Sequence, residues 1–115
     1  MSKLRLGVLA ATLAAAASAC GTETDDRPAT AQYVVTTILR PSCATAACHS
    51  SQTAVQGLVF DTVAGACAAY DEHDVQAFLV GNGAGGLRMP ADSPLPTADV
   101  DLLQQWLDDG QPGCP

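Results

Sequence analysis

The stretch Cys43-Ala44-Thr45-Ala46-Ala47-Cys48-His49 is the most informative part of this 115-residue chain. It places two cysteines close together, and a histidine follows the second directly. Just upstream, apolar residues recur at the spacing of one helix face: they are Ala31, Val34, Val35, Ile38 and Leu39. Because the residue before a proline is pushed out of the α region, we expect this helix to end at Pro41. The cysteine motif is therefore predicted to follow a short amphipathic helix, for which Thr30 is the expected N-cap.

A close cysteine pair that ends in Cys-His is typical of covalent haem c attachment, where two residues ordinarily separate the cysteines. Here four residues lie between Cys43 and Cys48. In this interpretation the two thiols add across the haem vinyl groups as thioethers, and His49 becomes an axial ligand of the iron. The sequence therefore predicts one covalent haem c, held by an attachment loop that is wider than usual.

The N-terminus has the pattern of an export signal, with two basic residues, an apolar run and small residues before Cys20. The apolar run is shorter than the roughly 20 residues of a membrane span, so we expect residues 1–19 to be a cleaved signal peptide. Small residues before a cysteine favour lipidation of Cys20, which would anchor the protein to a membrane at the periplasm or cell surface. The Ala17-x-Ala19 pattern also suits an ordinary signal peptidase, so cleavage without lipidation stays open.

The remainder of the chain divides into a tether and one domain. Residues 20–30 are polar, lack periodicity and contain no large apolar side chain, which predicts a flexible tether that starts at Cys20. Residues 31–115 are enough for one small domain and too few for two.

The charge balance disfavours some partners. Once Lys3 and Arg5 are removed with the signal peptide, three arginines remain against twelve acidic residues, a net charge of −9. Such a surface repels phosphate backbones and anionic head groups, so we expect no binding to nucleic acid. A basic protein is the expected electrostatic partner, although the charge equally suits a role in solubility alone.

The exported part retains four cysteines, Cys43, Cys48, Cys67 and Cys114, in an oxidising compartment where free thiols are not expected. Two schemes use all four. In the first, Cys43 and Cys48 form thioethers to haem and Cys67 pairs with Cys114. In the second, the domain has two disulfides and no haem, as small domains with thin cores often do. A Cys-Cys-His-Cys zinc site is the weakest alternative, because it needs reduced thiols.

Helical patterns continue after the motif. One helix is expected over residues 63–70, behind a cap at Asp61-Thr62. Another is expected over residues 71–80, with Asp71 and Glu72 favourably placed at its positively polarised start. The glycine-rich residues 81–86 predict a loop.

The last helix has the clearest pattern. Thr97 is its expected cap and Gly110 its expected stop. Its buried stripe is predicted to consist of Val100, Leu103, Trp106 and Leu107. The domain is therefore expected to be all-α, with about four short helices joined by long loops.

A haem iron in an electron carrier usually takes a second strong ligand, and the exported chain offers few. Met89 is the one methionine left after the leader, and Pro90 would stiffen the loop that carries its thioether. His73 is the one other histidine, but it lies in the charged cluster Asp71-Glu72-His73-Asp74 and is expected to face solvent. Met89 is therefore the predicted second ligand.

Taken together, these features resemble the small monohaem cytochromes c of exported and lipid-anchored bacterial proteins. The resemblance spans about residues 31–110 and follows the family's order: N-terminal helix, Cys-x4-Cys-His, short helices, Met89-Pro90 and a C-terminal helix. It implies that Cys43 and Cys48 bind haem covalently, with His49 as the proximal iron ligand and Met89 as the distal one. It also implies that the first and last helices pack together, bringing Val35 and Leu39 toward Leu103 and Trp106.

The function implied is one-electron transfer to a redox protein partner, because both axial positions of the iron would be filled. We therefore expect an electron carrier rather than an enzyme. No Ser-His-Asp arrangement or isolated carboxylate pair favours hydrolytic or acid-base catalysis. The alternative class is a non-haem surface lipoprotein, stabilised by disulfides, that serves as a protein-interaction module.

Overall fold

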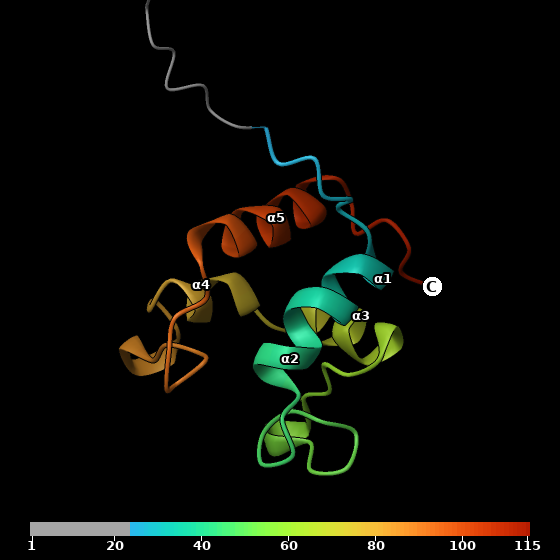
Figure 1. Cartoon of the computed structure of the whole chain (residues 1–115). Coiled ribbons are helices and arrows are strands. Elements are labelled where there is room, and N and C mark those ends of the chain that lie inside the picture. The colour runs from blue at the N-terminus through green and yellow to red at the C-terminus, as the bar shows by residue number, and fades with distance from the viewer. Residues whose placement is uncertain (1–23) are drawn as a thin grey trace, which may run out of the picture.

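The structure is a computed structural model that describes residues 24–115, so the predicted signal peptide and Cys20 lie outside the described part (Figure 1). Its helices are α1 (Ala31–Val34), α2 (Arg40–Cys43), α3 (Val63–Glu72), α4 (Val75–Leu79) and α5 (Thr97–Asp108). A π-helical turn, η1 (Val35–Leu39), joins α1 to α2, and short 3-10 turns lie at η2 (Val55–Gly57) and η3 (Ala84–Gly86). Residues 24–115 contain no strand. The predicted all-α fold of short helices with long loops is confirmed.

The sequence predicted that the first helix ends at Pro41, and this prediction is wrong. Thr30 caps it as expected, accepting a hydrogen bond from the Tyr33 N–H, but the helical path continues through η1 and α2 to Cys43. A proline normally breaks a helix because its ring clashes with the carbonyl four residues back. Here a widened π turn precedes Pro41, with the Arg40 N–H donating to the Val35 carbonyl five residues back. Cys43 therefore lies on the last turn of this helix.

The boundary between α3 and α4 also differs from the prediction. The predicted helix over residues 63–70 is present and extends to Glu72, and Thr62 caps it. At His73 the backbone becomes extended. Asp74 then caps α4, since its side chain accepts a hydrogen bond from the Ala77 N–H. Asp71 and Glu72 thus end α3 instead of starting the next helix, because Asp74 provides the cap side chain.

Helix α5 carries the predicted buried stripe. Leu103 and Trp106 are fully buried, Val100 and Leu107 are half-buried, and Leu102 adds a further core side chain. Thr97 is the first helical residue instead of the cap. Gly110 follows the helix with a φ of +83°, a left-handed conformation that favours glycine, so the predicted stop is confirmed.

The core joins the two ends of the domain, as the resemblance implied. Val35, Leu39, Leu103 and Trp106 are all buried in one hydrophobic cluster. The C-terminal tail returns to α1, where the Ala31 N–H donates to the Pro112 carbonyl at 2.8 Å. The predicted disulfide between Cys67 and Cys114 is present and ties this tail to α3.

The end of the predicted tether contacts α5. The Arg27 guanidinium lies 2.6 Å from the Asp99 carboxylate and donates to the Ala98 carbonyl at 3.0 Å. It also pairs with Asp25, and these carboxylates raise the pKa of Arg27 above its usual value. Arg27 therefore fixes the point at which the end of the predicted tether contacts the domain.

Among residues 24–115, none of the helices combines the length and the apolar character that crossing a membrane requires.

Candidate functional site

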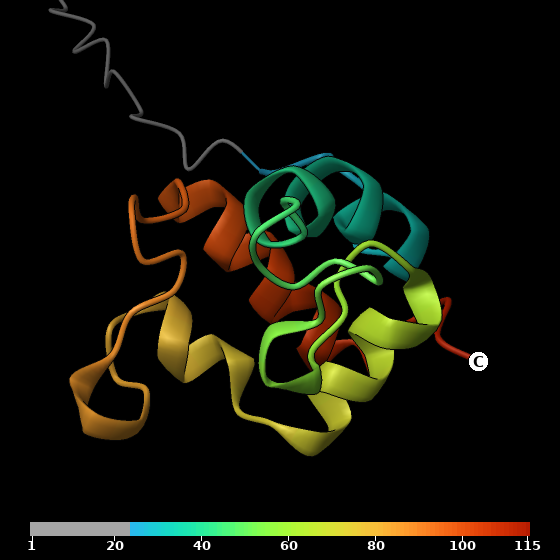
Figure 2. The same ribbon diagram turned by 90° about the horizontal axis from the view of Figure 1, so that it is seen from below.

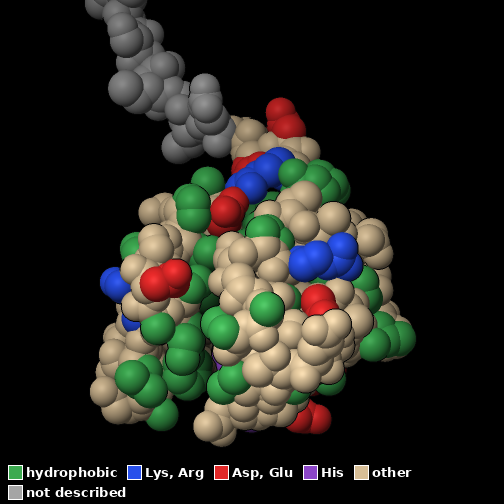
Figure 3. Space-filling model, turned by 60° about the horizontal axis from the view of Figure 1, so that its bottom comes forward, with side chains coloured by type: hydrophobic (Ala, Val, Ile, Leu, Met, Phe, Trp, Pro, Cys, Tyr) green, Lys and Arg blue, Asp and Glu red, His purple; other side chains and the backbone are tan. Residues whose placement is uncertain are grey.

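A pocket of about 360 Å³ lies between the loop after α2 and the segment that leads from α4 to α5. Its wall contains all four predicted haem-binding residues, Cys43, Cys48, His49 and Met89. Most of the other lining side chains are small or apolar, and Asp92 adds a carboxylate. Figure 3 shows the hollow from below, with hydrophobic side chains along its walls. The fold thus brings residues from two distant parts of the sequence to one apolar pocket.

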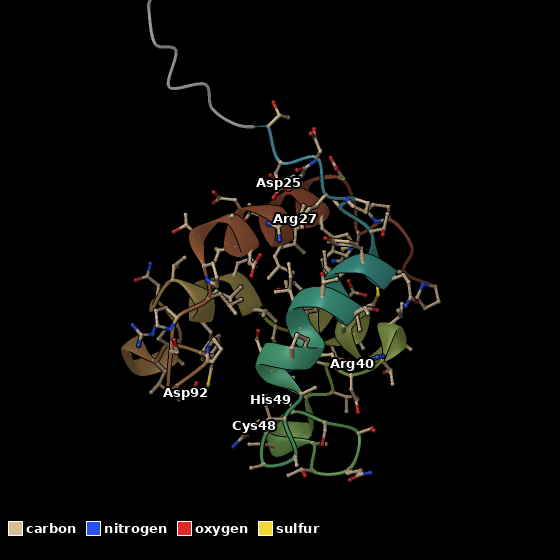
Figure 4. All side chains as sticks on the ribbon, in the orientation of Figure 1. Asp25, Arg27, Arg40, Cys48, His49 and Asp92 are labelled. Carbon is tan, nitrogen blue, oxygen red and sulfur yellow. A yellow bond between two sulfur atoms is a disulfide. The ribbon has the colours of Figure 1, made fainter. Side chains whose placement is uncertain are left out.

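The pocket lies at the opposite end of the domain from the N-terminal attachment. In Figure 4, Asp25 and Arg27 lie beside α5 at one end, whereas Cys48, His49 and Asp92 lie at the other. Figure 2, which views the domain from below, shows the loop after α2 near the centre and the segment between α4 and α5 apart from it at the left. The pocket therefore opens between two loops that the helical core supports.

The His49 imidazole is held in a defined tautomer. Its Nδ1 lies 2.9 Å from the carbonyl oxygen of Val55. A carbonyl only accepts hydrogen bonds, so Nδ1 carries the proton and donates. In the neutral imidazole Nε2 then keeps its lone pair, and within residues 24–115 it makes no hydrogen bond. Histidines that bind metals typically donate the other ring N–H to a carbonyl or carboxylate in this way.

Backbone hydrogen bonds close the widened cysteine loop. The His49 N–H donates to the Cys43 carbonyl at 3.0 Å, and the Cys48 N–H donates to the Thr45 carbonyl at 2.9 Å. The Cys48 carbonyl in turn accepts from the Val55 N–H at 3.1 Å. These bonds return the chain to the end of α2, so the four intervening residues do not carry Cys48 away from the pocket that Cys43 lines.

The two cysteines of the motif differ in their surroundings. They are not bonded to each other, and Cys43 is half-buried whereas Cys48 is exposed. Burial, with a smaller effect from Cys48, raises the pKa of the Cys43 thiol to about 11. Cys43 is therefore a neutral thiol at physiological pH, and Cys48 is the more accessible of the two.

Met89 reaches the pocket from the other arm. Its backbone N–H donates to the Phe78 carbonyl at 3.0 Å, which attaches the segment to the end of α4. The residue is 37% exposed, so its thioether is not part of the hydrophobic core. This exposure suits a ligand to a pocket occupant better than it suits a packing role.

Several contacts that hold the loop after α2 were not identified from the sequence. Asp61 accepts hydrogen bonds from the N–H and hydroxyl of Ser51, which lowers the pKa of its carboxyl group, and Arg40 donates to the Asp61 carbonyl at 3.0 Å. Val55 supplies the carbonyl for His49. A backbone carbonyl leaves no residue-type signal, and contacts between distant loop residues depend on the folded chain.

The remaining candidates lie away from the pocket. His73 is exposed at the junction of α3 and α4, as expected. Cys67 and Cys114 are consumed by their disulfide, so a Cys-Cys-His-Cys zinc site does not form. Among residues 24–115, no three His, Cys, Asp or Glu side chains are grouped so that they could hold a metal ion.

Comparison with known proteins does not place the chain in a family: no family model, curated protein or solved structure matches it.

Proposed function

We propose that this protein binds one haem c covalently in the pocket and carries single electrons at the cell envelope. The observation that carries the proposal is the hydrogen bond from His49 Nδ1 to the Val55 carbonyl, which leaves the Nε2 lone pair free to bind a metal. The pocket is also lined by Cys43, Cys48 and Met89. When bound, the haem supplies an iron that cycles between two oxidation states. The chain supplies the attachment, the ligands and the surroundings.

Each pocket residue has a distinct role in this proposal. Cys43 and Cys48 would hold the haem as thioethers, since addition of a thiol S–H across a vinyl double bond requires no net oxidation. His49 would bind the iron through Nε2, and the Val55 carbonyl holds the imidazole in the tautomer that leaves this nitrogen free. Met89 offers its thioether from the opposite arm, and methionine ligation raises the reduction potential. With ligating side chains on both arms, a bound haem would favour outer-sphere electron transfer over oxygen chemistry.

The donor set and the pocket lining suit a large apolar cofactor. The pocket is built mainly from small and apolar side chains such as Ala47, Val55 and Pro90. Burial of an apolar surface there is favourable at roughly 25 cal/mol per Å².

The contact of Arg27 with α5 favours a particular arrangement at a membrane. Arg27 fixes the N-terminal segment to α5, at the end of the domain away from the pocket. If Cys20 is lipidated, the pocket faces away from the anchoring surface and is open to a redox protein partner. The acidic surface as a whole favours a basic partner.

Expression together with cytochrome c maturation proteins tests the proposal. The expected product is red, has a Soret band and yields pyridine haemochrome spectra of a thioether-linked haem. His49→Ala should abolish the native low-spin spectrum, whereas the matched variant His73→Ala should leave it intact. A colourless product with Cys43 and Cys48 in one disulfide-linked peptide would contradict the proposal and support the interaction module.

A further inference from the structure

The geometry points to Phe60 as a positioning residue that sets the orientation of the His49 imidazole plane. The inference rests on the proposed function, because the orientation of this plane matters for an iron ligand. Phe60 does not itself line the pocket, so it would act through His49, which does.

Phe60 contacts His49 twice. Its backbone N–H donates to the His49 carbonyl at 2.8 Å. Its ring lies edge-to-face against the imidazole, with ring centroids 5.6 Å apart and an interplanar angle of 88°. Edge-to-face contact of this kind is the favoured geometry for two aromatic rings. Backbone and side chain of one residue therefore restrain the same histidine.

The Phe60 ring is itself supported from behind. It is 3% exposed and packs edge-to-face against Tyr70 of α3, with centroids 6.4 Å apart. Tyr70 packs in the same manner against Trp106 of α5 at 5.1 Å. The Trp106 indole N–H donates to the Pro112 carbonyl, which fixes the end of this series. A row of buried rings thus connects the pocket histidine to the core, so Phe60 has little room to turn.

Two restraints together determine the orientation of the His49 imidazole plane. The Val55 carbonyl fixes the position of Nδ1, but a single hydrogen bond leaves the ring free to rock about it. The perpendicular Phe60 ring limits that rocking. The plane of an axial imidazole determines how its π orbitals overlap with the iron d orbitals. Phe60 should therefore influence the magnetic anisotropy and the reduction potential of the bound haem.

The test compares Phe60→Leu with Tyr33→Leu in the haem-loaded protein. Both variants replace an aromatic ring by leucine, but Tyr33 lies on α1 and makes no aromatic contact with His49. We expect Phe60→Leu to shift and broaden the low-spin EPR lines, to shift the haem methyl proton resonances and to change the reduction potential, while Tyr33→Leu leaves all three unchanged. Equal spectra for Phe60→Leu and the wild type would overturn the inference.

A second measurement needs no variant. In the wild-type protein purified without haem, the Phe60 ring current should displace the His49 ring-proton resonances, and nuclear Overhauser contacts should join the two rings. Absence of both would contradict the inference even if Phe60→Leu fails to fold. Failure of the proposed function is distinguishable, because the ring contacts would then persist in a protein that never acquires a Soret band.

Discussion

The carbonyl oxygen of Val55 lies 2.9 Å from Nδ1 of His49, and it determines which nitrogen of the imidazole is free. Val55 is oriented by its neighbours: Ala54 and Gln56 both have positive φ values, 43° and 56°. Residues with side chains adopt this left-handed region at a cost. The chain therefore accepts backbone strain at the position that directs a carbonyl toward the candidate ligand.

Substitutions at Gln56 should separate the effect of this turn from that of the side chain. Gln56→Val should weaken the His49–Val55 hydrogen bond, because a β-branched residue tolerates positive φ poorly. Gln56→Gly should keep the bond and raise stability by at most about 1 kcal/mol. The Nδ1–H resonance of His49 measured by NMR reports the bond directly. Equal exchange protection of this proton in the two variants would show that the strained turn does not position Val55.

Removal of the Met89 thioether should alter the proposed redox centre and leave the fold intact. Since the residue is 37% exposed, Met89→Ala should cost little stability, but loss of methionine ligation should lower the reduction potential of the loaded protein. Leu87→Ala is the matched control, because Leu87 lies on the same arm, is 55% exposed and does not line the pocket. A potential that falls equally in both variants would remove Met89 from the iron.

The two motif cysteines should differ in reactivity in the protein without haem. At pH 8 Cys48 should be alkylated quickly by iodoacetamide and Cys43 slowly, because Cys48 is exposed and the pKa of Cys43 is raised to about 11. Mass spectrometry of timed samples measures both rates. Alkylation of Cys43 as fast as Cys48 would show that the thiol is not buried.

The raised pKa of Cys43 also predicts a dependence of stability on pH. A thiol whose pKa is higher in the folded state favours folding below its ordinary value of 9.0, and this contribution is lost as the pH rises toward about 11. The urea midpoint of the unloaded protein should therefore fall more over this interval than that of Cys43→Ala. Parallel pH profiles for the two proteins would contradict this prediction.

Loss of the Cys67–Cys114 disulfide should destabilise the domain strongly. The bond closes a loop with a sequence separation of 47, for which chain entropy corresponds to about 4 kcal/mol. The double variant Cys67→Ser, Cys114→Ser should show this loss in urea unfolding. A change well below 1 kcal/mol would mean that the contact between Ala31 and Pro112 already holds the tail.

Features that depend on local residue patterns were predictable from the sequence. Trp106 and Leu103 follow helical spacing, and Thr30 caps the first helix as expected. The pairing of Cys67 with Cys114 followed from counting cysteines, provided that Cys43 and Cys48 are used elsewhere. The four residues that the resemblance implied as haem ligands or attachment points, Cys43, Cys48, His49 and Met89, do line one pocket.

Features that arise from the balance between neighbouring groups were not predictable in the same way. Pro41 normally stops a helix, but the π turn before it lets the helix continue to Cys43. The role of Val55 depends on a backbone carbonyl, which any residue type could supply. The contact of Phe60 with His49 depends on how the loop between them folds back.

The most direct test of the central claim is the intact mass of the protein under denaturing conditions, after expression with cytochrome c maturation proteins. We predict that the wild type carries a mass increment of one haem that survives unfolding. The double variant Cys43→Ala, Cys48→Ala should carry none. The single variants should carry haem in a smaller fraction of molecules, through the remaining thioether. A wild-type mass without haem, reduced only by the two hydrogen atoms lost in a Cys43–Cys48 disulfide, would contradict the haem c assignment.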